Sequence, residues 1–514
     1  MSKQSKQGVL SYRIEQESAS ANLTGLAGLG PYLDLACASG LVSSIHRNLG
    51  IRGGGQGWTD AQIVMSLILL NLAGGDRVDD LEQLNSDEGF GKLLRRCETH
   101  GLSRSSRREM CKRWRKVRTR SVVSASAARR YLSMFHDESQ EKLRMPGKAL
   151  IPKANENLLG LRRVNSEFLA WVDHSSRQMI ATLDLDATLI ETSKREALYC
   201  YKGYRAYQPY NVWWAEQGLM LHSEFRDGNV PAGYDQLRVL KEALSYLPVG
   251  VQKVQLRSDS AGYEHKLLRY LATGANERFG RIEFAISSDV TQEFKKAVEE
   301  VDEEAWQPLY KDMNGKEVKT SREWAEVCFV PNPIAFGNKA PAYRYLATRE
   351  ALREPALPGM EDAQLSLPFQ TMSHGGVTYK VFGVVTNLDW YGGDVIRFHD
   401  GRCGKCEEAH KILKEDFAGG TMPSSEFGAN AAWWAIAVLA MNLAMAMNRV
   451  VLGGVWANRR MKAIRFLIIC IPGRLVEKAR QLYLRLSRGH PAFELLQAMR
   501  QRISELATSP PATA

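Results

Sequence analysis

Hydrophobic residues recur at helical spacing through the first 150 residues of the chain. The segment GWTDAQIVMSLILLNLAGG (57–75) has Thr59 or Asp60 as its N-cap, followed by a long apolar run and a Gly-Gly stop. In residues 78–97, leucine and phenylalanine recur three and four positions apart, which is typical of an amphipathic helix. The pattern predicts a helical region over residues 1–150.

An alternating pattern of polar and apolar positions begins near residue 178. The segment QMIATLDLDATLIET (178–192) predicts a strand, and residues 207–228 predict two more strands across a Glu-Gln-Gly turn. A helical pattern follows at 232–247, and two strands separated by a helix follow within 251–290. This order of elements predicts an α/β domain with a mixed sheet.

The remaining chain divides into an irregular part and a helical part. Short apolar runs separated by proline and glycine indicate a β-rich insertion, after which the segment VTYKVFGVVTNL resumes the α/β pattern. From Gly404 onward we expect helices to the end of the chain. The expected segments are a helical region at 1–150, the first part of the α/β core at 151–300, the β-rich insertion at 301–380, the remainder of the core with C-terminal helices at 381–500, and a tail at 501–514.

One apolar segment, residues 429–448, is nearly long enough to span a bilayer. It contains Asn430, Asn442 and Asn448, and basic residues follow it, so we expect a buried helix packed on a sheet. The polar N-terminal residues show no signal-peptide pattern, and eight scattered cysteines indicate reduced thiols. These features predict a cytoplasmic protein that does not enter a membrane.

The distribution of basic residues indicates a partner. The formal net charge is +11 and the pI is about 9.1, which favours a polyanion. Between Arg104 and Arg130 almost every charge is positive, and a second helix is predicted at 121–135 after a short turn, as in a helix-turn-helix. A solvated basic face is the alternative, but the length of the run favours DNA. The residues expected to contact phosphates are Arg108, Lys112, Arg113, Arg115 and Lys116.

Acidic residues lie within or at the ends of the predicted strands, where they could form a catalytic or metal-binding site. Asp184 and Asp186 face the same side of the first strand, and a carboxylate among leucines is costly unless it is paired or binds a cation. Asp259 ends the strand VQLRSDS, and open α/β sheets bind their ligands at strand ends. These acids are therefore candidates for a shared site.

A third acid would come from the helix predicted within GRCGKCEEAHKILKEDFAGG (401–420). Glu407, His410 and Lys414 share one helix face, whereas Glu408 points about 100° away. Two strand acids and one helix acid can converge on hard cations such as Mg²⁺. Two such ions, about 4 Å apart, can activate a water or a 3′-hydroxyl and stabilise the leaving oxygen of a phosphodiester.

A zinc site is the competing interpretation of the same stretch. Cys403 and Cys406 form a Cys-x-x-Cys pair, which supplies two of the four ligands that zinc requires. No second close pair of cysteine or histidine follows, so we interpret both cysteines as packing thiols.

Five motifs taken together carry a resemblance to a known family. They are LDLDAT (183–188), LRSDSAGY (256–263), VVTNLDW (384–390), CGKCEEAHKILKEDFAGG (403–420) and FGANAAWW (427–434). The chain resembles the DDE transposases of bacterial insertion sequences, specifically the 1380-type family within the wider group of cut-and-paste enzymes that have a β-strand insertion. The resemblance covers about residues 20–500. It implies an RNase H-like catalytic core with a mixed sheet, a β-rich insertion and a helical N-terminal DNA-binding region.

The resemblance also implies a role for each acid. Asp186, Asp259 and Glu407 would be the catalytic, metal-binding triad, holding two Mg²⁺ ions, with Mn²⁺ as a substitute. Asp184 is the alternative to Asp186, but the family's Asp-x-Thr pattern fits Asp186. Glu408 is the alternative to Glu407, but the family's Glu-x6-Lys spacing to Lys414 fits only Glu407.

Contacts to DNA near the site follow from the same resemblance. Lys414 would contact a phosphate near the scissile bond, and His410 would line the site without a proton-transfer role. The family's arginine position is occupied by Cys403, with Arg402 one residue away as the expected DNA contact. Trp306 and Trp324 are the candidates for stacking on a flipped base, with core packing as the alternative.

The implied function is that of an insertion-sequence transposase. It would cleave DNA at the element ends in a metal-dependent reaction and transfer the 3′-hydroxyl into target DNA. The expected partners are double-stranded DNA, as terminal inverted repeats and target, and a second copy of the chain in a homodimer on paired ends, at the bacterial nucleoid. Two other classes stay open: a sequence-specific DNA-binding protein with an inactive core, and a host-adapted RNase H-like nuclease that cuts without joining.

Overall fold

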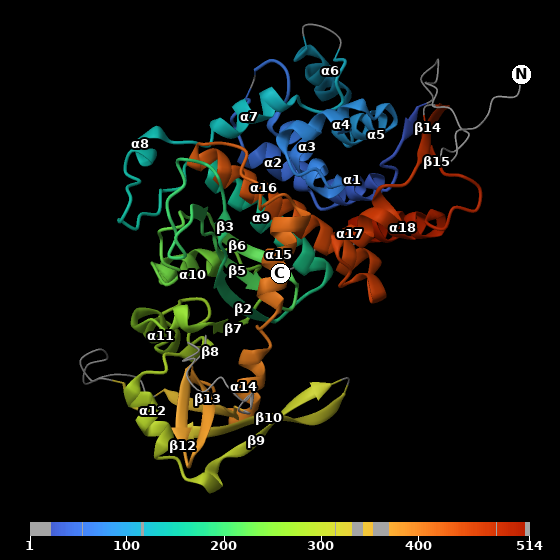
Figure 1. The fold of residues 1–514 in the computed structure, drawn as a ribbon. Coiled ribbons are helices and arrows are strands. Elements are labelled where there is room, and N and C mark those ends of the chain that lie inside the picture. Colours follow the sequence, from blue (N-terminus) through green and yellow to red (C-terminus); the bar gives the residue numbers. More distant parts are fainter. Residues whose placement is uncertain are drawn as a thin grey trace, which may run out of the picture.

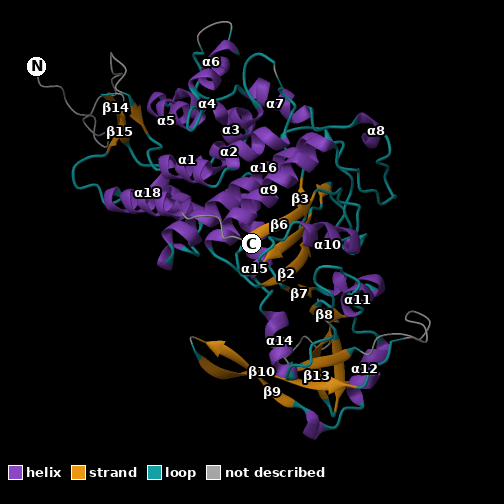
Figure 2. Ribbon diagram, turned by 180° about the vertical axis from the view of Figure 1, so that it is seen from behind, coloured by secondary structure: helices purple, strands orange, loops and turns teal. Residues whose placement is uncertain are grey.

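Helices of the N-terminal region, a central sheet and a strand-rich extension follow one another along the molecule (Figure 1). The computed structural model describes residues 22–53, 55–114, 118–313, 315–331, 343–352, 370–479 and 481–508. Seen from behind, the strands occupy the middle and the far end, whereas the other end is almost entirely helical (Figure 2). The site described below lies where the central sheet meets the C-terminal helices.

The N-terminal region is helical, as predicted. Helix α3 begins after Thr59, whose hydroxyl accepts a hydrogen bond from the Gln62 amide in a capping box, and it ends at Gly74 with φ +98°. The helices are α1 (Leu29–Ala38), α2 (Leu41–Asn48), α3 (Asp60–Ala73), α4 (Leu81–Ser86), α5 (Glu88–Glu98), α6 (Arg104–Lys112), α7 (Ala125–Ser133), α8 (Glu138–Glu141) and α9 (Glu156–Ser175).

The predicted helix-turn-helix differs from the observed structure in its turn. Helix α7 has the expected cap, in which the Ser124 hydroxyl accepts from the Ala127 amide. However, residues 113–124 separate it from α6, which is longer than a short turn. Helix α6 ends where the Arg113 guanidinium donates to carbonyls of the 52–57 turn.

The central sheet is mixed, which confirms the predicted α/β core. Strands follow the order β6-β5-β2-β7-β8, in which β2, β7 and β8 are parallel and β5 runs antiparallel to both β2 and β6. Helices α10 and α11 lie in the connections between these strands. Their bounds are β2 (Ile180–Ala187), β3 (Ile190–Glu191), β4 (Ala206–Tyr207), β5 (Tyr210–Trp214), β6 (Leu219–Glu224), α10 (Gln236–Ser245), β7 (Lys253–Ser258), α11 (His265–Ala272) and β8 (Glu283–Ser288).

The predicted insertion is rich in strands and continues the same sheet. Strand β13 pairs antiparallel with β8, and the order then runs β13-β11-β10-β9, with β12 also paired to β13. The elements are α12 (Gln292–Glu299), β9 (Gln307–Met313), β10 (Lys316–Val327), β11 (Arg344–Ala351), β12 (Thr371–His374) and β13 (Val377–Thr386).

The expectation of helices from Gly404 to the end is wrong in one place. After α14 (Gly392–Asp400), α15 (Lys405–Asp416), α16 (Phe427–Ala446) and α17 (Met461–Ile464), the chain forms a hairpin of β14 (Gly473–Lys478) and β15 (Gln481–Arg485) before α18 (Phe493–Thr508). Good helix formers fill this stretch, but β14 pairs with β1 (Leu23–Thr24) near the other end of the described chain. A distant strand partner therefore overrides the local helix propensity.

The apolar segment that could be mistaken for a membrane span is α16. It continues into residues 447–452, and most of it is buried against α3, α7, α9 and β6. Its asparagines have partners inside the protein: Asn442 accepts from the Met220 amide at 2.9 Å and donates to the Asn165 side chain at 2.8 Å. The predicted buried helix is confirmed.

Candidate active site

The first feature of the site is a buried ion pair between the two central parallel strands. Asp184 on β2 is paired in register with Arg257 on β7. The guanidinium donates to both carboxylate oxygens, at 2.6 and 2.8 Å, and the Asp184 side chain is completely buried. A third donor of Arg257 reaches the carbonyl of Phe398 on α14 at 3.0 Å. Asp184, the alternative for the first catalytic acid, is therefore neutralised and holds the sheet and α14 together.

Two like charges come next along the same strands. The last paired residues are Leu185 and Ser258, so Asp186 and Asp259 follow on β2 and directly after β7. Burial, together with the nearby charges of Asp259 and Glu407, raises the pKa of Asp186 to about 7, and the charge of Arg402 opposes this rise. Asp259 and Glu407 thus both lie within electrostatic reach of Asp186.

Local caps hold two of these acids in place. Asp259 accepts a hydrogen bond from the Ala261 amide at 3.1 Å, and Glu407 accepts from the Gly404 amide at 2.8 Å at the start of α15. In the described part of the chain, no group of three or more His, Cys, Asp or Glu side chains is gathered closely enough to bind a metal ion as it stands. The acids share a site, but Glu407 would have to leave its cap to join the aspartates around a cation.

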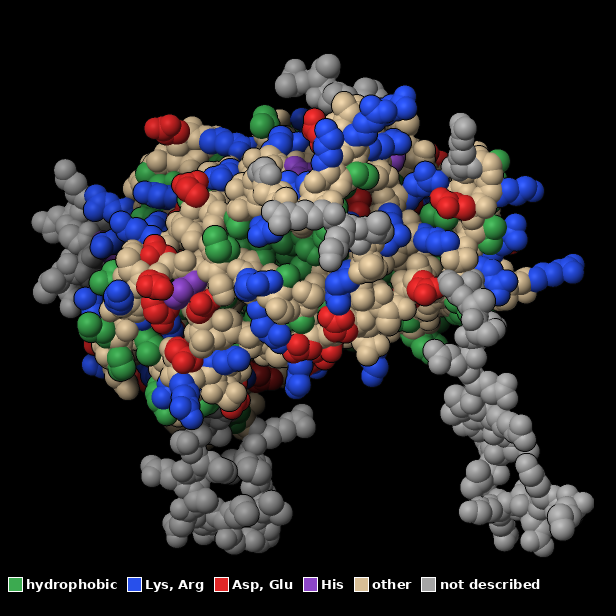
Figure 3. All heavy atoms as spheres, turned by 90° about the horizontal axis from the view of Figure 1, so that it is seen from above, with side chains coloured by type: hydrophobic (Ala, Val, Ile, Leu, Met, Phe, Trp, Pro, Cys, Tyr) green, Lys and Arg blue, Asp and Glu red, His purple; other side chains and the backbone are tan. Residues whose placement is uncertain are grey.

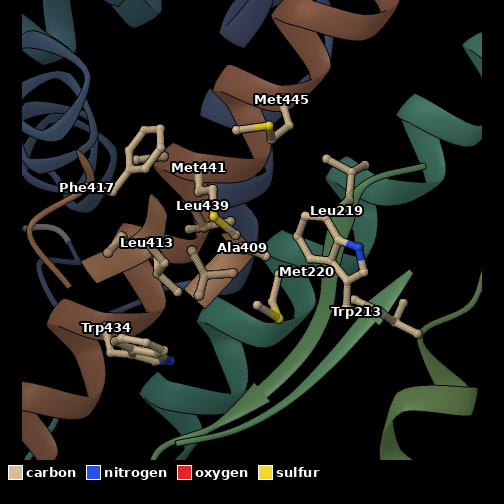
Figure 4. Close-up of a cluster of buried hydrophobic side chains, with 14 of the residues drawn as sticks. Trp213, Leu219, Met220, Ala409, Leu413, Phe417, Trp434, Leu439, Met441 and Met445 are labelled. Atoms are coloured by element: carbon tan, nitrogen blue, oxygen red, sulfur yellow. The ribbon is translucent and has the colours of Figure 1, made fainter. Parts of the chain in front are cut away.

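The orientation of α15 follows from its apolar face. Ala409 and Leu413 are buried and point toward Leu439 and Met441 of α16 (Figure 4). The other face turns to β2, where the Lys414 ammonium donates to the Thr188 hydroxyl at 3.0 Å and to the Leu189 carbonyl at 3.3 Å.

His410 lies on this same face of α15, because it interacts with Asp186. His410 and Lys414 therefore share the face that their spacing predicts, and the shared position of Glu407 stays a prediction. Glu407 and Glu408 are both exposed, but only the charge of Glu407 is among those that raise the pKa of Asp186.

A chain of hydrogen bonds fixes the protonation of His410. The Trp434 indole can only donate, and it donates to the Ser223 hydroxyl at 2.7 Å, which in turn donates to the Asn211 side-chain oxygen at 2.6 Å. The Asn211 amide nitrogen lies 3.0 Å from His410 Nε2, so Nε2 accepts and Nδ1 carries the proton.

That assignment directs the Nδ1–H of His410 toward Asp186. His410 Nδ1 is 4.0 Å from Asp186 Oδ2. Burial, with the nearby charges of Lys414 and Arg402, lowers the pKa of His410 to about 3, so the ring is neutral at neutral pH. The histidine therefore lies next to Asp186 without adding charge.

Arg402 is the cation that faces the two aspartates. Its side chain is buried, and Nη1 lies 3.6 Å from Asp186 Oδ2. Burial opposes its charge, but the carboxylates of Asp186 and Asp259 keep the pKa of the guanidinium above its usual value. Its Nε has no hydrogen-bond partner within the described residues. Arg402 thus lies in the site rather than on a surface beside it.

Both predicted base-stacking tryptophans are buried. Arg349 lies over the Trp306 ring at 4.2 Å from its centroid. Trp324 packs against the Gly392 backbone and is edge-on to Tyr391, with ring centroids 5.0 Å apart. Both tryptophans are therefore packed in the protein core, which is the alternative to base stacking.

The predicted basic residues of the N-terminal region differ in their surroundings. Arg108 and Lys112 are exposed on α6, which buries none of its residues. Arg113 instead donates to the carbonyls of Arg52, Gly53 and Gly57 at 2.8–3.1 Å, so it stabilises a turn. Arg115 and Lys116 lie outside the described residues.

Figure 3 shows the end of the molecule that carries the N-terminal helices. Lys and Arg side chains are spread over this surface, with smaller groups of acidic side chains between them.

Cys403 and Cys406 have different environments. Cys406 is buried, and burial raises the pKa of its thiol, whereas Cys403 is exposed. Neither belongs to a metal-binding group in the part of the chain that is described.

Sequence reasoning missed Arg257, Asn211 and Ser223. Arg257 stands two residues before Asp259, and this spacing in an extended chain turns both side chains to the side that carries Asp184 and Asp186. The shared side of the sheet could therefore have predicted that Arg257 pairs with a strand aspartate. Asn211 is opposite Asp186 on β5, but the pairing register could not be read from sequence.

Comparison with known proteins identifies the family. A family profile described as transposase DDE domain, group 1, matches residues 55–331 and 370–508, which is most of the chain. The chain belongs to this transposase family. No match was found among curated proteins. The piggyBac transposase synaptic complex with hairpin DNA is similar at 11% sequence identity, over 93% of this chain and 82% of that chain, with a TM-score of 0.41.

Because the pKa of Asp186 is raised in the folded protein, the stability of this transposase should depend on pH. The folded protein binds this proton more tightly than the unfolded chain, so stability is lost as the pH rises from about 4 to about 7. At pH 8 in EDTA, we expect Asp186→Asn to stabilise the fold by up to about 4 kcal/mol, with little effect near pH 4. Urea unfolding at both pH values measures this.

Asp184→Asn is the matched control for that experiment. It leaves the Arg257 charge buried without its partner, so it should destabilise the protein at both pH values. Destabilisation by Asp186→Asn at pH 8 would contradict the repulsion between Asp186 and its acidic neighbours.

Proposed function

We propose that this chain is the transposase of an insertion sequence of the 1380-type family. In this proposal it cleaves DNA at the element ends and transfers the freed 3′-hydroxyl into target DNA. The observation that carries the proposal is Asp186 beside Asp259 at neighbouring strand ends, with a pKa raised by burial and by two acids, in a chain of the DDE transposase family. Buried carboxylates that repel one another are a common preparation for binding a hard cation.

Asp186, Asp259 and Glu407 would hold the metal ions. The donor set fits, because it offers only carboxylate oxygens, which Mg²⁺ and Mn²⁺ prefer, and because a cation would relieve the repulsion that raises the pKa of Asp186. When bound, two such ions would activate a water or a 3′-hydroxyl and stabilise the leaving oxygen of the phosphodiester.

The remaining residues would orient the acids and the DNA. His410 has its Nδ1 4.0 Å from Asp186 Oδ2 and would donate to that carboxylate if the two side chains moved closer. Arg402 would turn from the aspartates to a DNA phosphate once other positive charge is present, because its guanidinium has an unused donor. Lys414, anchored beside β2, would contact a phosphate near the scissile bond.

The larger assembly in this proposal follows the family resemblance. The core is RNase H-like, the region 1–150 binds the terminal inverted repeats, and a homodimer holds paired ends next to target DNA. The exposed Arg108 and Lys112 support a DNA-binding role for α6. The protein would act in the cytoplasm, associated with the nucleoid, and the mostly buried α16 supports a location away from membranes.

The test of the function uses a plasmid that carries the gene's own flanking DNA, with Mg²⁺. We expect excision and joining by wild type and by Glu408→Ala, and a loss of more than about a hundredfold for Asp259→Ala and Glu407→Ala. Gel analysis of the excised and joined products measures both steps. Glu408→Ala is the matched control because it removes the neighbouring carboxylate on another helix face.

Other outcomes separate the alternatives. Cleavage without joined product would favour the nuclease, and binding to the flanks without cleavage would favour the DNA-binding protein. Loss of activity in Glu408→Ala but not in Glu407→Ala would show that the assigned acid is wrong.

The role of α6 can be tested with residues that lie a few positions apart. Arg108→Ala with Lys112→Ala should weaken DNA binding for all sequences and reduce the slope of log K against log salt by about 2, without changing the melting temperature. Arg113→Ala should instead destabilise the fold by about 1–2 kcal/mol, because three carbonyls lose their donor. An unchanged salt dependence in the double variant would remove α6 from the DNA interface.

A further inference from the structure

A short hairpin leaves the sheet directly after the strand that carries Asp186. Strands β3 and β4 pair antiparallel, with Ile190 opposite Tyr207, and residues 192–205 form the connection. Its tip is closed by backbone hydrogen bonds: Cys200 N donates to Tyr204 O at 2.9 Å, and Gly203, with φ +83°, donates to Cys200 O at 3.0 Å. The tip is therefore a tight turn that presents its side chains in a fixed arrangement.

Two tyrosine rings on this tip are exposed, and each has a cation beside it. Tyr199 is 59% exposed and Tyr201 is 78% exposed. The Arg205 guanidinium lies 4.8 Å from the Tyr199 ring centroid, and the Lys202 ammonium lies 5.8 Å from that of Tyr201. Arg205 is fixed by its hydrogen bond to the Ala197 carbonyl at 2.7 Å.

Exposed tyrosine rings beside basic side chains are typical of sites that bind single-stranded nucleic acid. Exposed aromatic rings with cations between them bind unpaired nucleic-acid strands, because bases stack on the rings while the cations contact the phosphates. Trp306 and Trp324, the residues that the sequence suggested for stacking, are buried, whereas these tyrosine rings are open to solvent.

The tip also lies close to the proposed site. Thr188 and Leu189, which join β2 to the hairpin, bind the Lys414 ammonium. Burial lowers the pKa of Lys414, and the charge of Lys202 lowers it further, so the tip is within electrostatic reach of Lys414. A DNA end at the acids could therefore extend along the hairpin.

We propose that the hairpin tip, residues 199–205, binds unpaired bases at the DNA end that is being processed. Tyr199 and Tyr201 stack on bases, and Lys202 and Arg205 contact the phosphates of the same strand. This inference rests on the proposed function, because it requires DNA in the site.

The test measures binding of two fluorescent DNA duplexes by anisotropy. Both carry the gene's terminal flanking sequence, one with a blunt end and one ending in three unpaired nucleotides. Tyr199→Ala with Tyr201→Ala should bind the unpaired end roughly tenfold more weakly than wild type and the blunt end equally well. Tyr199→Phe with Tyr201→Phe should bind like wild type, because stacking needs the ring and not the hydroxyl. Tyr310→Ala is the control, because Tyr310 is a 40% exposed tyrosine on β9, outside the hairpin.

Each other result overturns the inference. Equal affinity of the double alanine variant and wild type for the unpaired end removes the hairpin from the DNA path. An equal loss on both duplexes, or a loss in the phenylalanine variant, contradicts base stacking. If wild type binds neither duplex and does not cleave flanking DNA with Mg²⁺, the proposed function fails as well. Wild-type cleavage with an unaffected double alanine variant overturns the hairpin role alone.

Discussion

The repulsion between Asp186 and Asp259 is the constraint on which the site depends. Both carboxylates stand at the ends of adjacent parallel strands, and Asp186 is mostly buried, so its charge is unfavourable without a counter-charge. Two residues earlier in the chain than each of these acids, Asp184 and Arg257 form a neutral pair in which the guanidinium donates to both carboxylate oxygens. The backbone pairing of β2 with β7, up to Leu185 and Ser258, holds the strands together next to the acids, so the acids cannot relieve their repulsion by separation of the strands.

The surrounding elements hold this unfavourable arrangement in place. Packing of α15 on α16 places His410 next to Asp186, and the hydrogen-bond chain from Trp434 to His410 keeps the proton of the neutral ring on Nδ1. Arg402 lies in the turn that precedes α15. Arg402 partly balances the charge of Asp186, and Glu407 stays on the cap of its own helix. In the proposed function, Glu407 would leave this cap and join the two aspartates around a cation.

Local patterns in the sequence were sufficient for the central strands, for the start of α3 at Thr59 or Asp60, and for the shared face of His410 and Lys414, because these depend on neighbours within a few residues. Features that depend on distant partners were not predictable. The β14–β15 hairpin pairs with β1, the burial of Trp306 and Trp324 depends on the packing of the extension, and the chain through Asn211 depends on strand register. The Asp184–Arg257 pair was predictable in part. Alternation along each strand shows which face of the sheet each side chain occupies, but it does not show which residue on the other strand lies opposite.

Binding of Mn²⁺ to the protein without DNA, measured by electron paramagnetic resonance, tests the central claim most directly. The account expects wild type and Glu408→Gln to bind Mn²⁺ equally, because Glu408 lies on another face of α15. Asp259→Asn should weaken binding about tenfold or more, because it removes one of the two repelling carboxylates. Equal binding by all three proteins, or a loss confined to Glu408→Gln, would contradict a cation site at Asp186 and Asp259.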